Sequence, residues 1–242
     1  MCGRYAMDDT TNELVVEFVA AGGRAQDWIP NYNVAPTQRA PIVREFVDDA
    51  GTLEREIELA QWGFWPAWVK AGDKRPHPIN ARFETVASNG MFRGAFAERR
   101  CIVPMRGYYE WVAQPDGKQP HFIHDVDGEL LSAAGIYAVR KDDAGEWQVT
   151  YAVITREARD ASGEIHDRMP LFLTPDMRDE WLQPAKAGDV DSLMHNLDRA
   201  SSAIAKAIVT YPVSRAVNNV RTADATDPAL IEPLQAADTS PA

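Results

Sequence analysis

The sequence predicts an α+β fold in a single domain. Three observations support this class: helix-type patterns stand near both ends, short strand patterns fill the middle, and no Pro-, Gly- or Ser-rich linker divides residues 1–234. The 242 residues, of which 45% are hydrophobic, supply enough apolar side chains for a sizeable core and too many for a disordered chain. Residues 235–242 contain no aromatic or branched aliphatic side chain, so we expect a disordered tail there.

The first helix is predicted directly after the N-terminal segment. Thr10 and Glu13 have the spacing of a capping box, in which each residue satisfies a backbone N–H of the other. Apolar residues recur at helical spacing over residues 14–19, and Gly22-Gly23 is a stop signal. We therefore expect one amphipathic helix that ends at the glycine pair.

Strand patterns follow, beginning with a hairpin. Residues 42–46 and 57–59 alternate apolar and charged side chains on either side of a turn at residues 48–51. Turn signals at residues 115–117, 127–128 and 142–145 separate further strand-like runs. These runs are residues 101–104, 121–124, 130–139 and 147–155.

A second helix is predicted near the C-terminal end. Thr174 is a good N-cap, and Pro175 and Asp176 suit the first helical turn, so we expect a helix from here through Trp181.

Composition excludes several classes of protein. The chain has 36 acidic and 25 basic residues, a formal net charge of -11. No stretch approaches the roughly 18 consecutive apolar residues that a membrane span requires. The N-terminus turns acidic at Asp8-Asp9 without an apolar segment, which argues against a secretory signal and against a lipid anchor on Cys2. We therefore expect a cytoplasmic protein that does not bind a membrane.

Two cysteines and five histidines form no pattern typical of a metal site. No Cys-x-x-Cys pair and no His-Glu-x-x-His motif is present, so we expect no metal, no disulfide framework and no cofactor. Cys101 lies in an apolar run and is predicted to be a core thiol. The acidic balance argues against wholesale wrapping of nucleic acid, but 19 of the 25 cations are arginines, which suit directed phosphate contacts in a local cleft.

Cys2 has the most distinctive chemistry in the sequence. If Met1 is removed, which a small second side chain permits, residue 2 presents an α-amine and a thiol on adjacent carbons. About one in seven α-amines is neutral at pH 7, against about 0.04% of lysines, so this terminus would be the better amine nucleophile. The amine condenses with an aldehyde to an imine, and the thiol then closes on the imine carbon to give a thiazolidine ring. From position alone, the alternative is an incidental small residue at a frayed end.

Seven short motifs occur along the chain in a fixed order, and together they are highly specific. They are Met1-Cys2-Gly3-Arg4, residues 32–36 (YNVAP), 62–68 (WGFWPAW), 79–85 (INARFET), 107–111 (GYYEW), 166–170 (HDRMP) and 211–217 (YPVSRAV). This set resembles the SRAP family, the SOS response-associated peptidase proteins that shield abasic sites in single-stranded DNA. The resemblance runs from residue 2 to about Leu234. It implies an SRAP domain over residues 1–234, with a mainly antiparallel, barrel-like core and flanking helices.

The resemblance also implies catalytic residues. Cys2 matches the residue that captures the ring-opened aldehyde of an abasic deoxyribose. Asn80 matches the polar contact beside that linkage, a neutral amide that holds the terminal amine and a sugar hydroxyl. His166 matches a histidine that protonates or orients the sugar hydroxyl and assists reversal. The structural alternatives are a turn-forming Asn80 and a surface His166.

Glu110 matches the general acid and base of sugar-ring opening in the family. It stands between Tyr109 and Trp111, where we expect desolvation to raise the pKa of its carboxyl group toward neutrality. The alternative is a buried structural glutamate paired with an arginine.

Six further residues match DNA contacts of the family. Three arginines would grip phosphates beside the lesion, one aromatic ring would stack, one hydroxyl would make a polar contact, and one apolar side chain would wedge against a neighbouring base. In that order they are Arg4, Arg82 and Arg168, then Trp68, Thr155 and Met91. For each arginine, a solvated surface position is the alternative.

Two departures from the family pattern concern DNA affinity. Val69 stands where members often have a second aromatic residue, and Trp65 is a candidate to compensate. Gly90 stands where many members have an arginine before Met91, which leaves Arg93 as a substitute. Fewer phosphate contacts would weaken binding and would also remove roughly one unit each from its salt dependence.

The sequence thus predicts a monomeric protein that binds single-stranded DNA containing abasic sites and crosslinks to it through Cys2, associating with the nucleoid when bound. A second hypothesis is a cysteine-dependent peptidase, with Glu110 and His166 assisting Cys2, that removes Met1 or cleaves other peptides. A third is a module that binds single-stranded DNA without a covalent bond, so that added salt would fully reverse the binding.

Overall fold

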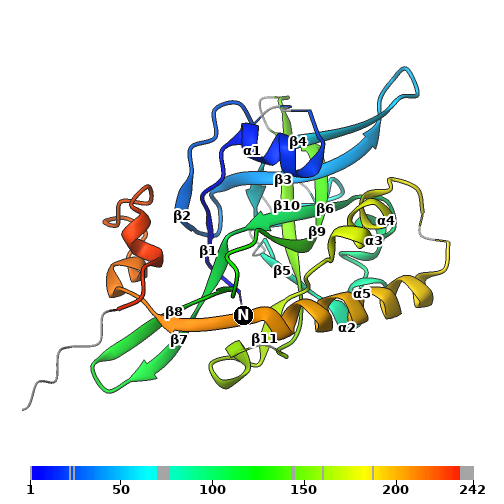
Figure 1. Ribbon diagram of the computed structural model, residues 1–242. Coiled ribbons are helices and arrows are strands. Elements are labelled where there is room, and N and C mark those ends of the chain that lie inside the picture. Colours follow the sequence, from blue (N-terminus) through cyan, green and yellow to red (C-terminus); the bar gives the residue numbers. More distant parts are fainter. Residues whose placement is uncertain are drawn as a thin grey trace, which may run out of the picture.

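The fold is built around a barrel of five strands (Figure 1). The computed structural model describes residues 2–21, 23, 25–69, 77–142, 145–159, 161–186 and 188–234. The barrel strands are β3 (Arg39–Val47), β4 (Leu53–Trp62), β6 (Arg100–Met105), β9 (Leu131–Lys141) and β10 (Trp147–Glu157). Neighbours are antiparallel except β4 and β10, which are parallel, and the pairing of β9 with β10 closes the ring.

Strand β10 also holds two short strands that carry site residues. β5 (Asn80–Arg82) lies parallel to residues 153–155 of β10, and β11 (Arg168–Pro170) lies antiparallel to residues 155–157. Thr155 is paired with Arg82 on one side and with Pro170 on the other. Three segments that are distant in the sequence therefore lie side by side.

A second sheet of five antiparallel strands packs beside the barrel (Figure 1). Its order is β12 (Ile208–Pro212), β8 (Gly117–Asp125), β7 (Gly107–Gln114), β1 (Tyr5–Met7) and β2 (Asn31–Val34). β1 lies between β7 and β2, with Tyr5 opposite Tyr108. This pairing fixes the segment that follows Cys2 within the second sheet.

Helices lie around the two sheets. α1 (Thr11–Phe18) contacts β4, α2 (Phe83–Val86) contacts β10, and α3 (Arg93–Glu98) and α4 (Arg178–Leu182) contact β6. α5 (Val190–Ile204) is the longest of the described helices and leads through a short 3-10 turn into β12. The 3-10 helices are Ala161–Glu164, Pro175–Met177, Ala205–Ala207, Arg215–Asn218 and Pro228–Ile231.

The capping box of the first helix is confirmed, but its predicted end is wrong. Thr10 Oγ1 accepts the Glu13 N–H at 3.3 Å, and the Thr10 N–H donates to Glu13 Oε2 at 2.6 Å. The helix ends at Val19, which adopts a left-handed φ of 49°, rather than at Gly22-Gly23, of which Gly22 lies outside the described residues. The early end frees Ala21 to bond with the backbone of Arg55 and Ile57 in β4.

The predicted hairpin and the four later strand runs are confirmed. β3 and β4 form the hairpin, and Gly51 supplies the left-handed φ of 83° that its turn needs. The runs correspond to β6, β8, β9 and β10, and Gln114 faces Gly117 across the turn at residues 115–116. Residues 143–144 of the predicted turn at 142–145 lie outside the described residues.

The second predicted helix begins as a 3-10 turn, Pro175–Met177, and continues as α4. Thr174 makes no side-chain capping bond. The sequence reasoning missed α5, whose buried residues Leu193, Leu197, Ala200 and Ser201 include small and polar side chains that weaken the apolar pattern. Its N-cap, Asp189, accepts the Ser192 N–H at 3.0 Å and was the available signal.

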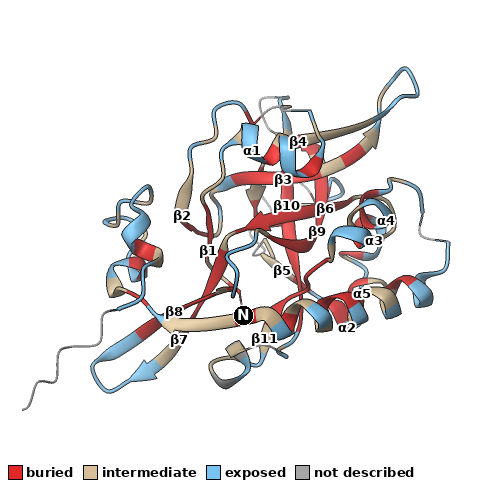
Figure 2. Cartoon of the chain, in the orientation of Figure 1, coloured by how far each residue is buried: buried red, intermediate tan, exposed pale blue. Residues whose placement is uncertain are grey.

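The main core fills the barrel and the space between the barrel and the second sheet (Figure 2). Cys101 is fully buried there, which confirms it as a core thiol. Within the described residues, no helix is long and apolar enough to cross a membrane. The α+β class with a barrel-like core is confirmed, and the predicted tail at 235–242 lies outside the described residues.

Candidate active site

Cys2 lies shortly before β1 and is buried rather than frayed. Its residue surface is fully buried, and Asn80 Nδ2 donates a hydrogen bond to its carbonyl oxygen at 2.8 Å. Asn80 is the first residue of β5, where the parallel pairing with Val153 holds its backbone. Asn80 Oδ1 is buried and has no hydrogen-bond partner among the described residues. The side-chain N–H of Asn80 therefore holds the Cys2 carbonyl, and its side-chain oxygen can still accept a hydrogen bond.

Burial raises the pKa of the Cys2 thiol, and the negative charge of Glu110 raises this pKa further. The thiol is therefore protonated near neutral pH, because desolvation disfavours the thiolate. A reaction at this sulfur requires a group that accepts its proton, and Glu110 is the acid whose charge acts on this thiol.

Glu110 is buried, as the sequence predicts, but its expected aromatic neighbours face elsewhere. Side chains alternate along β7, so Tyr109 and Trp111 point to a separate apolar cluster, where their ring centroids lie 6.4 Å apart. Tyr108, which shares a face with Glu110, packs in the main core with Cys2. The side chain of Glu110 is thus desolvated by the core around Cys2, and the residue itself is 3% exposed.

His166 stands just before β11 and is held by the backbone of Arg168. The Arg168 N–H donates to His166 Nδ1 at 3.0 Å, which leaves Nε2 as the protonated nitrogen of a neutral ring. Burial lowers the pKa of His166 and so favours this neutral form. If the ring gains a second proton, Nδ1 can donate instead to Asp167 Oδ1, which lies 2.9 Å away.

Among the residues that the structure describes, the partners that orient Arg4 are neutral. Its Nη1 donates to Asn33 Oδ1 at 2.7 Å and to the carbonyl of Val217 at 2.8 Å, while its guanidinium lies 5.7 Å from the centre of the Trp111 ring. Asn33 is 1% exposed, and its own Nδ2 also donates to the Val217 carbonyl. These contacts hold the Arg4 guanidinium in one orientation. None of the described acidic residues forms an ion pair with it.

Arg168 and Arg82 differ in their charge balance. Both terminal nitrogens of Arg168 bond to the Glu84 carboxylate, at 2.7 and 2.9 Å, and Nη2 also donates to the Thr155 carbonyl. Arg82 is exposed and has no ion pair with any residue that the structure describes. Thr155 is 1% exposed, which leaves its hydroxyl little access to solvent.

Trp68 and Met91 line one groove, about 350 Å³ in volume, together with Gly90 and Arg93. Trp68 is 58% exposed, whereas Val69 is buried and turns away from solvent. Trp65 does not line this groove: its ring centre lies 3.7 Å from the Arg140 guanidinium and 4.2 Å from the ring of His77. These two residues occupy its stacking surface, so the predicted compensation for Val69 is not supported. Arg93 lines the groove, and its role as a substitute stays a prediction.

Asn33 and Glu84 are the residues that the sequence reasoning did not single out. Both lie inside recognised motifs, next to or near residues that were named, but the sequence does not show that they contact Arg4 and Arg168. Among the described residues, no group of three or more His, Cys, Asp or Glu side chains could hold a metal ion. The groups that are present are a buried thiol, an acid, a neutral imidazole, an amide and arginines.

The chain is similar to several known proteins over most of its length. The chain is 32% identical to the abasic site processing protein YoqW of Bacillus subtilis over 234 residues, covering 96% of this chain and 99% of that protein. It is 31% identical to the abasic site processing protein YedK of Escherichia coli, covering 97% and 100%, and 28% identical to the abasic site processing protein HMCES of Xenopus tropicalis, covering 91% and 76%.

Solved structures show the same fold. A protein from Bacteroides thetaiotaomicron superposes with a TM-score of 0.77 at 22% identity, covering 97% of this chain and all of the other. A phage-related protein of Bordetella bronchiseptica superposes with a TM-score of 0.63 at 28% identity, covering 88% and 95%. The family model described as SOS response associated peptidase (SRAP) matches residues 1–220, and the chain belongs to this family.

Proposed function

We propose that this protein processes abasic sites by binding single-stranded DNA and forming a covalent thiazolidine with the opened deoxyribose through Cys2. The observation that carries the proposal is the buried Cys2, whose carbonyl accepts a hydrogen bond from Asn80. The charge of Glu110 acts on the thiol of the same residue and raises its pKa. The relatives named as abasic site processing proteins support it across most of the chain.

The reaction requires that Met1 is removed, so that the α-amine of Cys2 is free. The amine attacks the aldehyde carbon C1′, and loss of one water gives an imine. The thiol sulfur then bonds to C1′, and the thiol proton reaches the former imine nitrogen, which becomes the ring amine. The sum is one aldehyde plus one aminothiol giving one thiazolidine and one water, with no change in oxidation state. Because both nucleophiles belong to one residue, the second attack is intramolecular.

The acid and base groups have separable roles. Glu110 takes the Cys2 thiol proton and delivers it to nitrogen, because the raised pKa of the thiol requires a base. His166, neutral with its proton on Nε2, donates to a sugar oxygen during ring opening. Asn80 Oδ1 accepts an N–H of the α-amine and orients its lone pair toward the aldehyde.

The DNA contacts come from arginines on the segments that carry Cys2 and Asn80. The guanidinium of Arg4 has no ion pair with a described acidic residue. Arg82 is exposed and lies on β5, the strand that also carries Asn80. Phosphates on either side of the gap bind these groups, and a missing base admits the sugar to Cys2 without any base edge being read. The protein acts as a monomer that associates with DNA in the cytoplasm.

The experiment mixes the purified protein with an oligonucleotide that bears one abasic site. We expect a heat-stable band of reduced mobility on a denaturing gel, absent with Cys2→Ala and retained with Cys101→Ala. Cys101 is the matched control because both thiols are fully buried. Intact mass should show a chain that starts at Cys2. An unchanged band with Cys2→Ala, or trapping by a chain that keeps Met1, would refute the proposal.

A second candidate activity is removal of Met1 by the same site. In this reaction the Cys2 sulfur bonds to the Met1 carbonyl carbon, the amide C–N bond breaks, and the thiol proton passes by way of Glu110 to the Cys2 nitrogen, which leaves a thioester and a free α-amine. One water then hydrolyses the thioester, which releases methionine and restores the thiol. The protein is produced in cells or extracts that lack methionine aminopeptidase, and its mass is measured. Retained Met1 in Glu110→Gln, but not in the unchanged protein, supports self-processing, while retention in both refutes it.

A further inference from the structure

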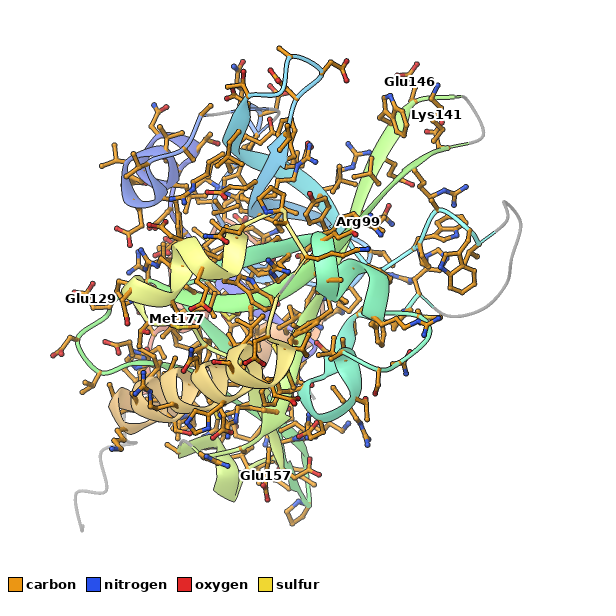
Figure 3. All side chains as sticks on the ribbon, turned by 90° about the vertical axis from the view of Figure 1, so that its right-hand side faces the viewer. Arg99, Glu129, Lys141, Glu146, Glu157 and Met177 are labelled. Atoms are coloured by element: carbon orange, nitrogen blue, oxygen red, sulfur yellow. The ribbon has the colours of Figure 1, made fainter. Side chains whose placement is uncertain are left out.

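The motif at residues 211–217 has no role in the proposed function, although it belongs to the set on which the family resemblance rests. Its first residues lie in β12, and its last residues belong to η4, the 3-10 helix Arg215–Asn218. η4 contacts β8 and lies at the left of Figure 1, next to the turn that joins β7 to β8. Arg99 of the Trp68 groove is labelled in Figure 3 on the face that forms the right-hand side of Figure 1, so the two features lie on different sides of the molecule.

Arg215 holds η4 against the end of the β7–β8 hairpin. Its Nη1 and Nη2 donate to the two oxygens of the Asp116 carboxylate, each at 2.8 Å, and Nη2 also donates to Gln114 Oε1 at 2.8 Å. Its Nε donates to Gln119 Oε1 at 3.3 Å. The hydrogen bonds from Arg215 lower the pKa of Asp116, so this carboxylate is ionised at neutral pH. All three nitrogens of the guanidinium are therefore bonded to the hairpin, in a planar geometry that an ammonium group cannot reproduce.

Asn218, the last residue of η4, holds the ring of Trp111. Trp111 Nε1 donates to Asn218 Oδ1 at 2.7 Å, and Asn218 Nδ2 donates to the Lys118 carbonyl at 3.1 Å. These two partners fix the orientation of the amide, because an indole N–H only donates and a carbonyl oxygen only accepts. The Trp111 ring lies 5.7 Å from the guanidinium of Arg4. Asn218 itself is exposed, so it adds little to the core and acts on the site through this ring.

The backbone of η4 also contacts Arg4 directly. The Val217 carbonyl accepts a hydrogen bond from Arg4 Nη1 at 2.8 Å, and Asn33 Oδ1 accepts another at 2.7 Å. Nη1 carries two hydrogens, so both are used. Arg4 Nε is buried and has no hydrogen-bond partner among the described residues. The hydrogens on Nη2, which bond to none of the residues that the structure describes, are therefore the ones left for a phosphate.

We propose that Arg215 and Asn218 are positioning residues that direct Nη2 of Arg4 toward the phosphate beside the abasic sugar. Arg215 does so by holding η4, and with it the Val217 carbonyl, in place. Asn218 does so by orienting the Trp111 ring beside the guanidinium. The inference rests on the proposed function, in which Arg4 binds a phosphate, and it gives η4 a role in DNA binding. If either positioning side chain is lost, Arg4 keeps its charge but loses its fixed direction.

The experiment compares Asn218→Ala with a matched control, Asn219→Ala. Asn219 is the next residue and is also exposed, but its side-chain oxygen accepts the Arg221 N–H at 3.1 Å instead of the indole N–H of Trp111. Fluorescence anisotropy gives the Kd for a single-stranded oligonucleotide that carries a stable abasic analogue without an aldehyde. We expect Asn218→Ala to raise the Kd about 3- to 10-fold, the size expected for one lost hydrogen bond, and Asn219→Ala to leave it unchanged.

A double-mutant cycle distinguishes positioning from a role that is independent of Arg4. Asn218→Ala is combined with Arg4→Gln, and binding is measured at low salt, where weak complexes are still resolved. If Asn218 acts through Arg4, the double variant binds as Arg4→Gln alone does. An equal loss of affinity from Asn218→Ala in both backgrounds would overturn the proposal.

Arg215→Gln is tested in the same cycle, with Arg221→Gln as its control. Arg221 is exposed in the same segment, so this control removes the same charge without touching η4. We expect Arg215→Gln to weaken binding in the unchanged background and to have no further effect in Arg4→Gln. A direct contact of Arg215 with DNA would instead reduce the slope of log K against log salt by roughly one in both backgrounds, which would refute a positioning role for this residue.

Folding and the proposed function are checked separately. We expect the asparagine variants to keep the melting temperature of the unchanged protein to within a few degrees, because both side chains are exposed. If Asn218→Ala fails to fold, the cycle with Arg215→Gln supplies the same test. If the unchanged protein forms no heat-stable band with a true abasic oligonucleotide, the proposed function fails. If the band forms and neither Asn218→Ala nor Arg215→Gln weakens binding through Arg4, only the positioning role fails.

Discussion

Replacing Glu84 with glutamine tests whether Arg168 is restrained by an internal competitor of DNA. In the free protein both Glu84 oxygens bond to Arg168, at 2.7 and 2.9 Å, in the bidentate geometry that a phosphate would use. Burial alone would raise the pKa of Glu84, but the bonds from Arg168 hold this pKa below its ordinary value. A phosphate that binds Arg168 in this geometry must displace a fully ionised carboxylate.

The magnitude follows from the exposure of the pair. Arg168 is 14% exposed in its side chain, but Glu84 is 48% exposed, so solvent screens the interaction. Ion pairs of this kind contribute about 0.2 to 1 kcal/mol, and two-point geometry places this one near the upper end. Releasing about 1 kcal/mol tightens DNA binding about fivefold, since about 1.4 kcal/mol corresponds to tenfold.

The assay is the Kd of Glu84→Gln for an oligonucleotide with the stable abasic analogue, measured at several salt concentrations. Glu17→Gln is the matched control, because Glu17 is 43% exposed and pairs with Arg178 at 2.8 Å. It removes the same charge from a comparable ion pair. If Glu84→Gln binds DNA more weakly than the unchanged protein, or no more tightly than Glu17→Gln, Glu84 does not compete with DNA for Arg168. Glu84 would then be a residue that positions Arg168.

Three further predictions concern other parts of the molecule. Gly90→Arg should tighten binding and steepen the salt slope by roughly one, because a Cβ at this position meets no atom within 4 Å and the longer side chain can reach a phosphate; unchanged salt titrations would contradict this. Asn33→Asp should weaken crosslinking several-fold by placing a carboxylate 2.7 Å from Arg4, whereas a band of undiminished yield would exclude that role. Gly107→Ala should lower stability by about 1 to 3 kcal/mol in denaturant unfolding, since its Cβ would clash with the Phe122 ring and lie 2.6 Å from the Ile123 carbonyl oxygen; equal midpoints would show that this strand pair relaxes freely.

Features set by neighbours in the sequence were predictable. The capping box of Thr10 and Glu13 and the hairpin turn with Gly51 depend on residues a few positions apart, and both formed as expected. The end of the first helix did not, because a backbone pairing of Ala21 with β4 outweighed the glycine signal. Closure of the barrel through β9 and β10 likewise depends on long-range pairing that no local pattern reveals.

The site shows the same division. Motif matching named Cys2 and Asn80, and the structure brings them to 2.8 Å, although 78 positions separate them. The face of Glu110 could have been read from strand alternation, since Tyr109 and Trp111 must point the opposite way. The partners of the arginines could not be predicted in this way. Glu84 and Arg168 are 84 positions apart, and only the folded chain shows that they form an ion pair.

The short distance between Cys2 and β1 has a mechanical consequence. β1 begins at Tyr5 and is clamped between β7 and β2, so a strand joined to Cys2 would be tethered by only two intervening residues. If an enzyme that moves along DNA pulled on such an adduct, the force would pass along β1. It would act on the backbone hydrogen bonds that join β1 to β7 and β2. Resistance to that load is governed by the rate at which the sheet opens, so removal of the adduct would start with forced unfolding from its first strand.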